Sequence, residues 1–551
     1  MKKFLIIFIS VLVLLILTLF FGAEWWLTNN LHRIVNKKPD RAYNIIYRDV
    51  DIHPFLKGIS LEGVEIKPIN TNKKTLIYGN VDVAEVKGIV WYDLLFGKRV
   101  NIDEMVFNQP EFEITILSDS ISERANSGKS MQQLFGDILS RADLNRFSVN
   151  EGRLVANMKL SPESSQDEMV QIGRIVNFNF EANEIVTDSV QWKFMIPFKI
   201  GSFTSSVDSV KFALDSNTVF RCKHMDYSSA ESVLVIEDAS LKFEKDWQKV
   251  SKEIGKQIDL IEFDLQSMVI RNIGAKSKLY GDLDIRASSI LIDGLKLMDH
   301  RDKNMPRPPD EMKPMFEGMV ESIPFPLKVD TVLVKNSDIH YTELGEGKTD
   351  PGTVSFNQVY GSIYNVTTLP EFQSSYRHFE ADILAKLNGS GNMQVRLEVP
   401  YESESFKLNV QLDSVNLAIL DTSSIPLADI KLTGMMYMLT LEMNAGKTEA
   451  TNVITMDYEN LQIDVLKSIS ENKKRRLGFW SSIANTMIRH NFRPGHKDYG
   501  PAQYTSERNI NRGPFNFIWN SIKEGFIQII PNKTAKGLMG EGKKNKKKKN
   551  K

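Results

Sequence analysis

The chain of 551 residues is 42% hydrophobic and 25% charged, a composition that excludes a wholly disordered protein. Its single cysteine, Cys222, excludes an intrachain disulfide framework and a cysteine-based zinc site. The formal net charge is zero, but Lys533 to Lys551 holds nine lysines and one glutamate, so the preceding residues carry a net charge of −8. A body of that charge is not basic enough for a nucleic-acid-binding protein.

An apolar run from Phe4 to Phe21 opens the chain. As a helix it would be about 27 Å long, enough to span a bilayer. Lys2 and Lys3 precede it, and Trp25 and Trp26 follow where an aromatic belt would lie. A cleaved signal peptide is the alternative, but the length of the run and the two tryptophans favour an uncleaved anchor. We expect a single-pass membrane protein with its amino terminus in the cytoplasm and its bulk exported.

A pattern of apolar residues recurs four times. In the segment 327–341, Val332 and Val334 are two residues apart, and Ile339 follows seven residues after Val332. The same offsets occur at Met105, Phe107 and Phe112, at Phe147, Val149 and Leu154, and at Phe263, Leu265 and Ile270. Period-two spacing predicts a strand, and the polar break between the pair and the third residue predicts a turn. Each copy is therefore predicted to be a hairpin.

Short amphipathic helices are expected before three of these copies. The segments Ser130–Ala142 and Asp246–Gln257 have apolar residues at helical spacing, and Asp310–Met319 has a less regular version of it. The copies begin at uneven intervals, which argues against a solenoid of fixed repeat length. A long sheet with insertions fits the pattern better.

The chain resembles the AsmA-like proteins of Gram-negative envelopes. The resemblance rests on the membrane anchor, the helix-and-strand modules, and the segments DIHPFLKGISLEGVEI and VDTVLVKNSDIHYTEL. It implies a mainly β fold, in which an elongated, strongly twisted antiparallel sheet folds into an open hydrophobic groove with short amphipathic helices. It also implies that the groove projects into the periplasm and takes part in lipid movement to the outer membrane.

The clearest predicted hairpin alternates apolar and polar residues from Met393 to Leu412, and the two apolar sets fall on one side. Few long amphipathic helices are available to cover that side, which favours an open lipid groove. The predicted groove lining comprises Val332, Val334, Ile339, Met393, Val395, Leu397, Val399, Phe406, Leu408, Val410 and Leu412.

The carboxy-terminal region changes character. A basic cluster, Lys473–Arg476, precedes a helical pattern in Leu477–Ile488, and a second helical stripe lies between Pro514 and Pro531. The stripe comprises Phe515, Ile518, Trp519, Ile522, Phe526 and Ile529. It predicts either a packed core contact or, as the functional alternative, a helix at the membrane interface, which the presence of two tryptophan-containing helices beside basic residues favours.

These patterns divide the chain into six parts. They are residues 1–27 as a transmembrane anchor, 28–300 as amino-terminal β-groove modules with short helices, 301–326 as a proline-rich connection, 327–470 as a carboxy-terminal β-groove, 471–532 as an amphipathic helical region, and 533–551 as a disordered lysine-rich tail.

Motifs for catalysis are absent from the sequence. No histidine pair has the spacing of a zinc-protease helix, and no nucleophile elbow or dinucleotide-binding glycine motif occurs. Gly345–Thr349 resembles the end of a phosphate-binding loop, but Thr342 stands where that loop needs glycine. We therefore expect no enzyme activity, cofactor or metal.

The sequence favours a non-catalytic envelope protein whose hydrophobic groove carries lipid, with phospholipid as the first candidate, between the inner and outer membranes. Exposing a sixteen-carbon chain to water costs about 12 kcal/mol, which makes a conduit necessary. An outer-membrane or periplasmic protein partner is expected to complete the path. The alternative is a periplasmic scaffold that assists outer-membrane protein assembly without conducting lipid.

Overall fold

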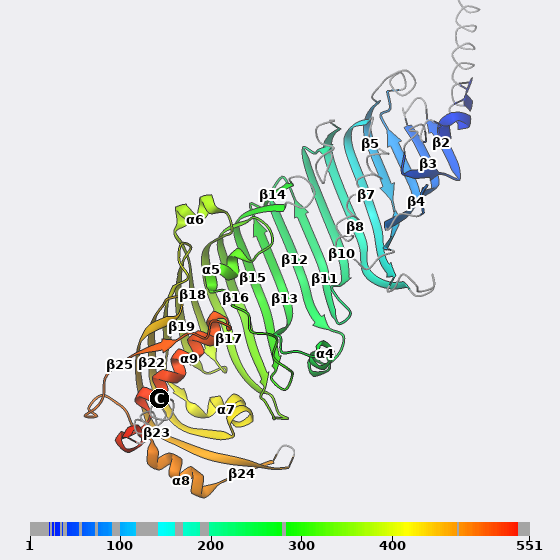
Figure 1. Cartoon of the computed structure of the whole chain (residues 1–551). Coiled ribbons are helices and arrows are strands. Elements are labelled where there is room, and N and C mark those ends of the chain that lie inside the picture. The colour runs from blue at the N-terminus through cyan, green and yellow to red at the C-terminus, as the bar shows by residue number, and fades with distance from the viewer. Residues whose placement is uncertain are drawn as a thin grey trace, which may run out of the picture. The chain divides into compact units, whose positions relative to one another are not determined.

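The computed structural model describes the chain except for residues 1–20, 23–24, 27, 34–35, 37–40, 54–57, 72–74, 91–99, 117–141, 160–168, 188–197, 278–282, 471–472 and 538–551. It divides into two compact units. The first unit comprises residues 1–239 and 274–284, and the second comprises residues 240–273 and 285–551. Both are built mainly from β-strands, which confirms the predicted fold class at that level (Figure 1).

The first unit contains the strands β1 to β11, the short strand β14 and most of β12. Their bounds are β1 (Tyr43–Ile46), β2 (Asp49–His53), β3 (Gly58–Pro68), β4 (Thr75–Lys87), β5 (Val100–Asn108), β6 (Glu111–Ile116), β7 (Ala142–Lys159), β8 (Met169–Thr187), β9 (Phe198–Lys199), β10 (Ser202–Ala213), β11 (Thr218–Ser228), β12 (Val233–Phe243) and β14 (Gly274–Ser277).

The second unit contains the remaining strands and the labelled helices. Its strands are β13 (Leu260–Arg271), β15 (Leu283–Asp302), β16 (Leu327–Leu344), β17 (Gly352–Thr367), β18 (His378–Leu387), β19 (Gly391–Pro400), β20 (Phe406–Leu412), β21 (Val415–Asn416), β22 (Ile430–Ala445), β23 (Glu449–Ser470), β24 (Lys473–Arg476) and β25 (Ala502–Glu507). Its helices are α4 (Trp247–Ile254), α5 (Phe316–Glu321), α6 (Pro370–Tyr376), the short 3₁₀ helix η2 (Leu417–Leu420), α7 (Asp421–Ala428), α8 (Gly478–Met487) and α9 (Pro514–Ile529).

The prediction of a twisted antiparallel sheet holds only in part, because the pairing is mixed. In the first unit, β5 and β6 both pair in parallel with β7. In the second unit, β15 pairs in parallel with β16, whereas β16 to β20 form an antiparallel series. Two parallel strands need a connection that carries the chain back to the end of the sheet at which the first strand begins. The proline-rich segment with α5 provides this return between β15 and β16.

The repeated apolar pattern marks bulged strands, so the prediction of four hairpins is wrong. Val332, Val334 and Ile339 all lie on the single strand β16. Between them, Asn336 has a left-handed φ of 47°, and the pairing with β17 shifts register there. In a regular strand, residues five apart such as Val334 and Ile339 would point to opposite faces. The extra residue at the bulge brings them back to the same face. Glu151 in β7 and Gln109 between β5 and β6 also have left-handed φ values, of 55° and 50°.

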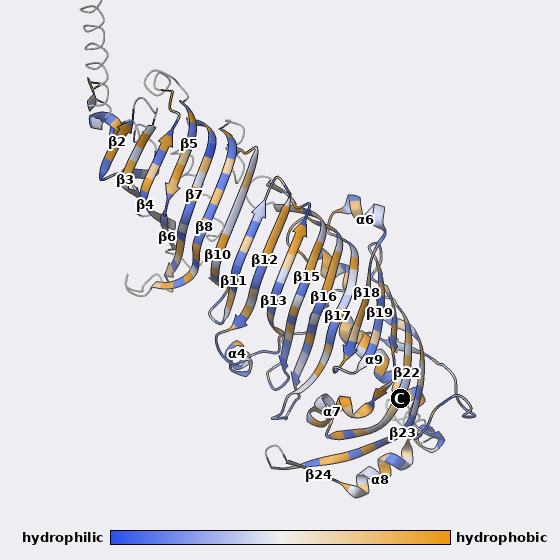
Figure 2. Cartoon of the chain, turned by 180° about the vertical axis from the view of Figure 1, so that it is seen from behind, coloured by the Kyte–Doolittle hydropathy of each residue, from blue (hydrophilic) through white to orange (hydrophobic). Residues whose placement is uncertain are grey.

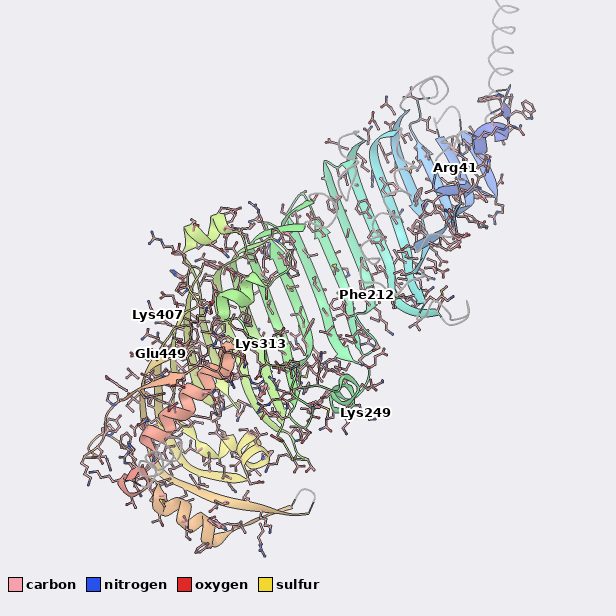
Figure 3. All side chains as sticks on the ribbon, viewed as in Figure 1. Arg41, Phe212, Lys249, Lys313, Lys407 and Glu449 are labelled. Carbon is pink, nitrogen blue, oxygen red and sulfur yellow. The ribbon has the colours of Figure 1, made fainter. Side chains whose placement is uncertain are left out.

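The hairpin predicted from Met393 to Leu412 is confirmed. The strands β19 and β20 pair in antiparallel register, with Met393 opposite Leu412, and Val395 opposite Val410. The exposed side of β20 carries Lys407, Asn409 and Gln411, so the predicted alternation of faces holds (Figure 3 labels Lys407).

Four of the predicted helices fall on described residues. The structure confirms α4, α8 and α9 with bounds within a few residues of those expected. The helix predicted in Asp310–Met319 begins only at Phe316, because the preceding residues form an extended segment. The segment Ser130–Ala142 lies almost wholly outside the described residues.

Both ends of the chain fall largely outside the description. Of the anchor predicted at Phe4–Phe21, only Phe21 is described, and no helix among the described residues is long and apolar enough to cross a membrane. At the other end, residues 533–537 are helical and Ala535 is buried. The rest of the predicted lysine-rich tail, residues 538–551, lies outside the described part.

Candidate functional site

One face of the second unit carries two continuous rows of apolar residues, which we call the second-unit apolar face. The first row joins Ile270, Ile290, Val332, Ile363, Ala381, Leu397 and Leu408, each directly opposite the next. The second row joins Met268, Ile292, Val334, Gly361, Ile383, Val395, Val410 and Leu441 in the same way. Because directly opposite residues point to the same side of a sheet, each row lies on one face.

The structure brings the predicted groove lining together. Eight of the eleven predicted residues belong to the two rows or to the pair Met393–Leu412 beside them, and Ile339, opposite Phe356 and Leu297, lies on the same face. The prediction missed Ile290, Ile292 and the β17 and β18 members. Their alternation in β15 was visible in the sequence, but only register aligns them with β16.

The two ends of this face differ in burial. The row members on β13, β15 and β16 are half-buried, as is Ile363 on β17. On β20 and β22 the row members Leu408 and Leu441 are buried. Gly361 lies near the middle of the second row, where a Cβ atom would come within 2.7 Å of Ile383 Cδ1, so glycine lets that side chain lie across the row.

Two helices cover the buried end. The Phe406 ring on β20 contacts Phe316 of α5 at a centroid distance of 5.1 Å and Phe517 of α9 at 6.4 Å. Both helices lie in front of the second unit's strands in Figure 1 and behind them in Figure 2, where the view is reversed. Of the predicted lining, Val399, Phe406, Leu408 and Leu412 are consequently buried in a packed core. The expectation that few helices were available to cover this side is wrong here.

The buried side of the helix α9 coincides with the predicted stripe only in part. Its buried residues include Phe517, Ser521, Gly525 and Ile529, spaced four apart. A Cβ atom at Gly525 would lie 2.8 Å from Ile454 Cδ1 on β23, so only glycine allows the helix to approach this closely.

The predicted stripe on α9 is therefore divided between two sides of the helix. Phe515 and Trp519 are exposed, at 69% and 53%, whereas Ile529 is only 2% exposed. Ile518, Ile522 and Phe526 are half-buried against the core. The small residues Ser521 and Gly525 were the sequence signal for the packed side, since a small residue every fourth position allows close helix packing.

Buried hydroxyl groups fasten α9 to the sheet. The Ser521 and Ser506 hydroxyl oxygens are 2.6 Å apart, and Asn452 Nδ2 donates to Ser506 Oγ at 2.9 Å. The Tyr504 hydroxyl donates to the Ser521 carbonyl oxygen at 2.7 Å. Burial raises the pKa of Tyr504 to about 12, so the hydroxyl remains a donor at neutral pH.

The first unit has its own apolar face, marked by a ladder of five aromatic rings. The ladder crosses β5, β7, β8, β10 and β11 with centroid distances of 5.4, 6.1, 5.8 and 5.0 Å, and its members are Phe107, Phe147, Phe180, Phe203 and Tyr227. Further along β10, Phe212, labelled in Figure 3, packs over Gly173 of β8. The repeated apolar pattern of the sequence already included Phe107 and Phe147.

The opposite face of the first unit carries many polar side chains. A hollow of about 520 Å³ is lined there by polar residues such as Arg146, Asn179 and Glu181 and by apolar residues such as Val106 and Val235. Arg146 and Glu181 form an ion pair at 2.9 Å across the hollow floor. These two charges neutralise each other, so neither is left unpaired to attract a charged ligand into the hollow.

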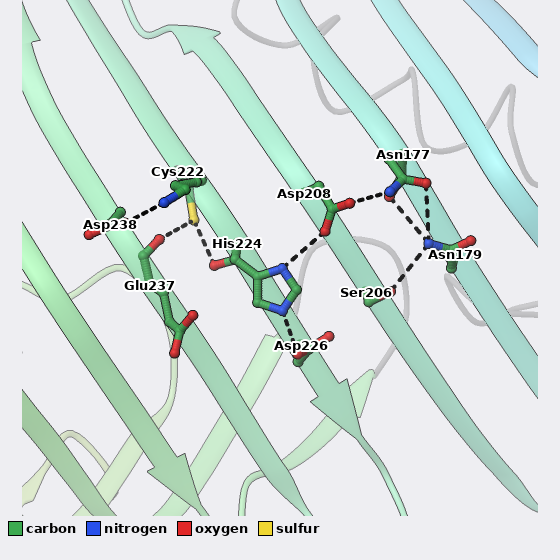
Figure 4. A network of polar contacts seen from close by, with 10 residues as sticks. Asn177, Asn179, Ser206, Asp208, Cys222, His224, Asp226, Glu237 and Asp238 are labelled. Atoms are coloured by element: carbon green, nitrogen blue, oxygen red, sulfur yellow. Dashed lines mark hydrogen bonds and ion pairs between the residues drawn. The ribbon is translucent and has the colours of Figure 1, made fainter.

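A hydrogen-bond network continues along this polar face (Figure 4). His224 lies between two carboxylates, with Nδ1 3.1 Å from Asp208 and Nε2 2.6 Å from Asp226. The hydrogen bond to Asp226 is the main cause of the raised pKa of His224. Asp208 also accepts from Asn177, a bulge residue of β8. No three His, Cys, Asp or Glu side chains of the described chain are grouped to hold a metal ion.

One end of the second-unit apolar face becomes polar. Asp299 lies opposite Ile261 and Tyr341, two residues beyond the apolar pair Phe263–Leu297. Burial, followed by the nearby Asp259 carboxylate, raises the pKa of Asp299 to about 6. The Tyr341 hydroxyl donates to Glu343 at 2.8 Å.

The arrangement of the second unit can hold long apolar groups along a face with a polar end. No protein-family model matches the chain, and no curated protein matches its sequence. The comparisons therefore neither support nor contradict a function for this face. The resemblance to AsmA-like proteins stays a prediction.

Proposed function

We propose that this protein is a non-catalytic lipid carrier of the bacterial envelope and that the second-unit apolar face holds acyl chains. The observation that carries the proposal is the pair of in-register rows from Ile270 and Met268 toward β20. These side chains remain half-buried on β13, β15 and β16. An apolar strip left part-exposed over four neighbouring strands favours an apolar ligand.

The strip suits a mobile lipid because no residue along it would bind tightly. Each methylene taken from water contributes about 0.8 kcal/mol, whichever apolar side chain it meets. A uniform wall therefore shields an acyl chain at successive positions without a deep energy minimum. The polar end around Asp299 and Tyr341 would meet a headgroup or water.

The proposal extends to the cellular location that the sequence predicts. Phe4–Phe21 would anchor the chain in the inner membrane with the bulk in the periplasm, and the lipid, phospholipid first, would pass between inner and outer membranes. Intact mass of the mature protein tests the anchor, because a signal peptide would leave an amino terminus near Ala23.

Adjacent positions on β16 provide a matched test of the lipid face. A photo-reactive amino acid at Val334 faces the apolar rows, whereas one at Leu333, equally apolar in type, faces the other side. We expect acyl-chain crosslinks from 334 and few from 333 in the full-length protein purified with its native lipids. Mass spectrometry identifies the adducts.

Equal crosslinking from both positions, or none from either, contradicts the proposal. Crosslinks from position 334 to unfolded outer-membrane proteins in place of lipid would instead support the scaffold alternative.

A further inference from the structure

The helix α8 is held to the sheet by its polar side. The Ser481 hydroxyl oxygen is buried and accepts a hydrogen bond from the Val465 amide at 2.9 Å. Asn485 accepts from the Ile463 amide and donates to the Ile463 carbonyl, both at 2.9 Å. These bonds satisfy backbone groups of β23 that would otherwise lie unpaired at a strand edge.

The aromatic side of α8 consequently faces away from the protein. Phe479 is 72% exposed, Trp480 57% and Ile483 37%, and the first two rings meet edge to face at 5.6 Å. An amphipathic helix normally buries its apolar side against the core. A helix that presents it outward leaves an apolar patch for a partner surface.

The strand β24 places basic residues beside this patch. Its sequence is Lys-Lys-Arg-Arg, and it ends one residue before the chain turns into α8 (Figure 1). Lys467 on β23 lies directly opposite Arg475, and both are exposed. Like charges at opposite positions destabilise a strand pair unless an anion lies between or above them.

Only part of this charge is neutralised within the protein. Arg476 pairs with Asp464. Among the residues that the structure describes, no acidic side chain forms an ion pair with Lys467 or Arg475. The helix itself has no charged residue from Gly478 to Met487.

We propose that α8 and β24 form a docking element for an anionic membrane surface. The rings of Phe479 and Trp480 enter the boundary between headgroups and acyl chains, and the side chains of Lys467 and Arg475 lie against lipid phosphates. Tryptophan is favoured at that depth, and basic residues are attracted to anionic lipid. This inference is independent of the lipid-carrier proposal, because it concerns the surface of the second unit and not its apolar rows.

Membrane contact is thereby assigned to α8 instead of α9. Sequence analysis placed membrane contact on the stripe of α9, but Ile529 is buried and Phe517 anchors that helix in the core. Of the exposed rings of α9, Phe515 and Trp519, the second has Lys523 near it, and the strand Lys473–Arg476, the one wholly basic strand in the described part of the chain, leads into α8 and not into α9. The two rings of α9 make a matched control for α8.

A fluorescent label on α8 tests the proposal in the full-length protein. Cys222→Ala removes the native thiol, and Ile483→Cys accepts an environment-sensitive dye. The protein is reconstituted in phosphatidylcholine nanodiscs, and vesicles of phosphatidylcholine, or of phosphatidylcholine mixed with phosphatidylglycerol, are added. We expect a blue shift and protection from an aqueous quencher only with phosphatidylglycerol, and a loss of both in high salt.

Variants separate this contact from general stickiness. The double change Phe479→Ser and Trp480→Ser should abolish the response, and Lys467→Ala with Arg475→Ala should reduce it at least severalfold. Phe515→Ser with Trp519→Ser on α9 should leave it unchanged. Circular dichroism confirms folding, which these exposed positions do not determine.

Three outcomes would overturn the proposal. The first is an equal response to both kinds of vesicle. The second is an equal loss from the α9 variant. The third is no response to vesicles together with a self-association that the α8 double variant removes, which would make α8 an interface between proteins.

Discussion

The same face of the second unit is open at β15 and β16 and covered at β20 to β23. Both regions have the same alternation of apolar and polar residues, and their apolar rows are continuous in register. The difference comes from α5 and α9, whose Phe316 and Phe517 close over Phe406. The strand pattern therefore creates an apolar face, and helices distant in sequence determine whether that face becomes a packed core or remains on the surface.

A single carboxylate placed at different positions of the second row should show the largest difference in stability between the covered and the open region. Leu441→Asp buries a carboxylate in the packed end, where the native side chain is 1% exposed, and we expect a loss of at least about 4 kcal/mol. Val334→Asp at the open end should lose only about 1 kcal/mol, because its carboxylate reaches water. Val410→Asp should fall between them. Urea unfolding followed by tryptophan fluorescence measures all three.

Gln411→Asp provides the control for that series, because Gln411 lies next to Val410 on the exposed side. It should leave stability nearly unchanged. A loss from Val334→Asp as large as that from Leu441→Asp would mean that the open end is also a packed core.

The covered end should open when α9 is displaced. Gly525→Leu adds a side chain where Ile454 and the Tyr504 hydroxyl already fill the space. We expect a destabilisation of about 2–3 kcal/mol from overpacking. The separation of α9 from β23 should also increase binding of a hydrophobic dye. Thermal unfolding and dye fluorescence measure the two effects.

Ile527→Leu is the matched control on α9, since Ile527 is exposed. It should change neither quantity. If Gly525→Leu is equally silent, α9 is not what covers this end of the face.

The smallest predicted effect concerns Asp299, whose pKa depends on how far water is excluded from the polar end of the open region. Asp299 has a pKa of about 6 in the folded protein, raised from an ordinary value of 3.8. Folding therefore favours the neutral acid, so this group disfavours the fold progressively as the pH rises from about 4 to about 6, and fully above that. The groups that face it are Asp259, Arg301 and Tyr341.

Asp299→Asn should remove this penalty. Each unit of pKa shift corresponds to about 1.4 kcal/mol, and solvent screening reduces this for a partly exposed carboxylate, so the variant should be about 1 kcal/mol more stable than the native protein at pH 7.5. The gain should vanish near pH 4. Denaturant unfolding of both proteins across this range tests the prediction, and a gain independent of pH would show that Asp299 is well hydrated.

The sequence by itself determined the β-rich fold, the β19–β20 hairpin and the helices α4, α8 and α9. Period-two and period-3.6 patterns are local, so they appear wherever a strand or a helix has one apolar side. The predicted lining around Val332 and Val410 was correctly assigned to one face for the same reason.

The tertiary structure alone decided which apolar sides are covered. The spacing of Val334 and Ile339 is compatible with either a turn or a bulge, and only pairing with β15 and β17 selects the bulge at Asn336. The orientation of α9 depends on the space that Gly525 leaves over Ile454, which no sequence period contains. The outward rings of α8 likewise follow from Ser481 and Asn485 bonding to the edge of β23, because a helix's amphipathic pattern does not specify which side meets the protein.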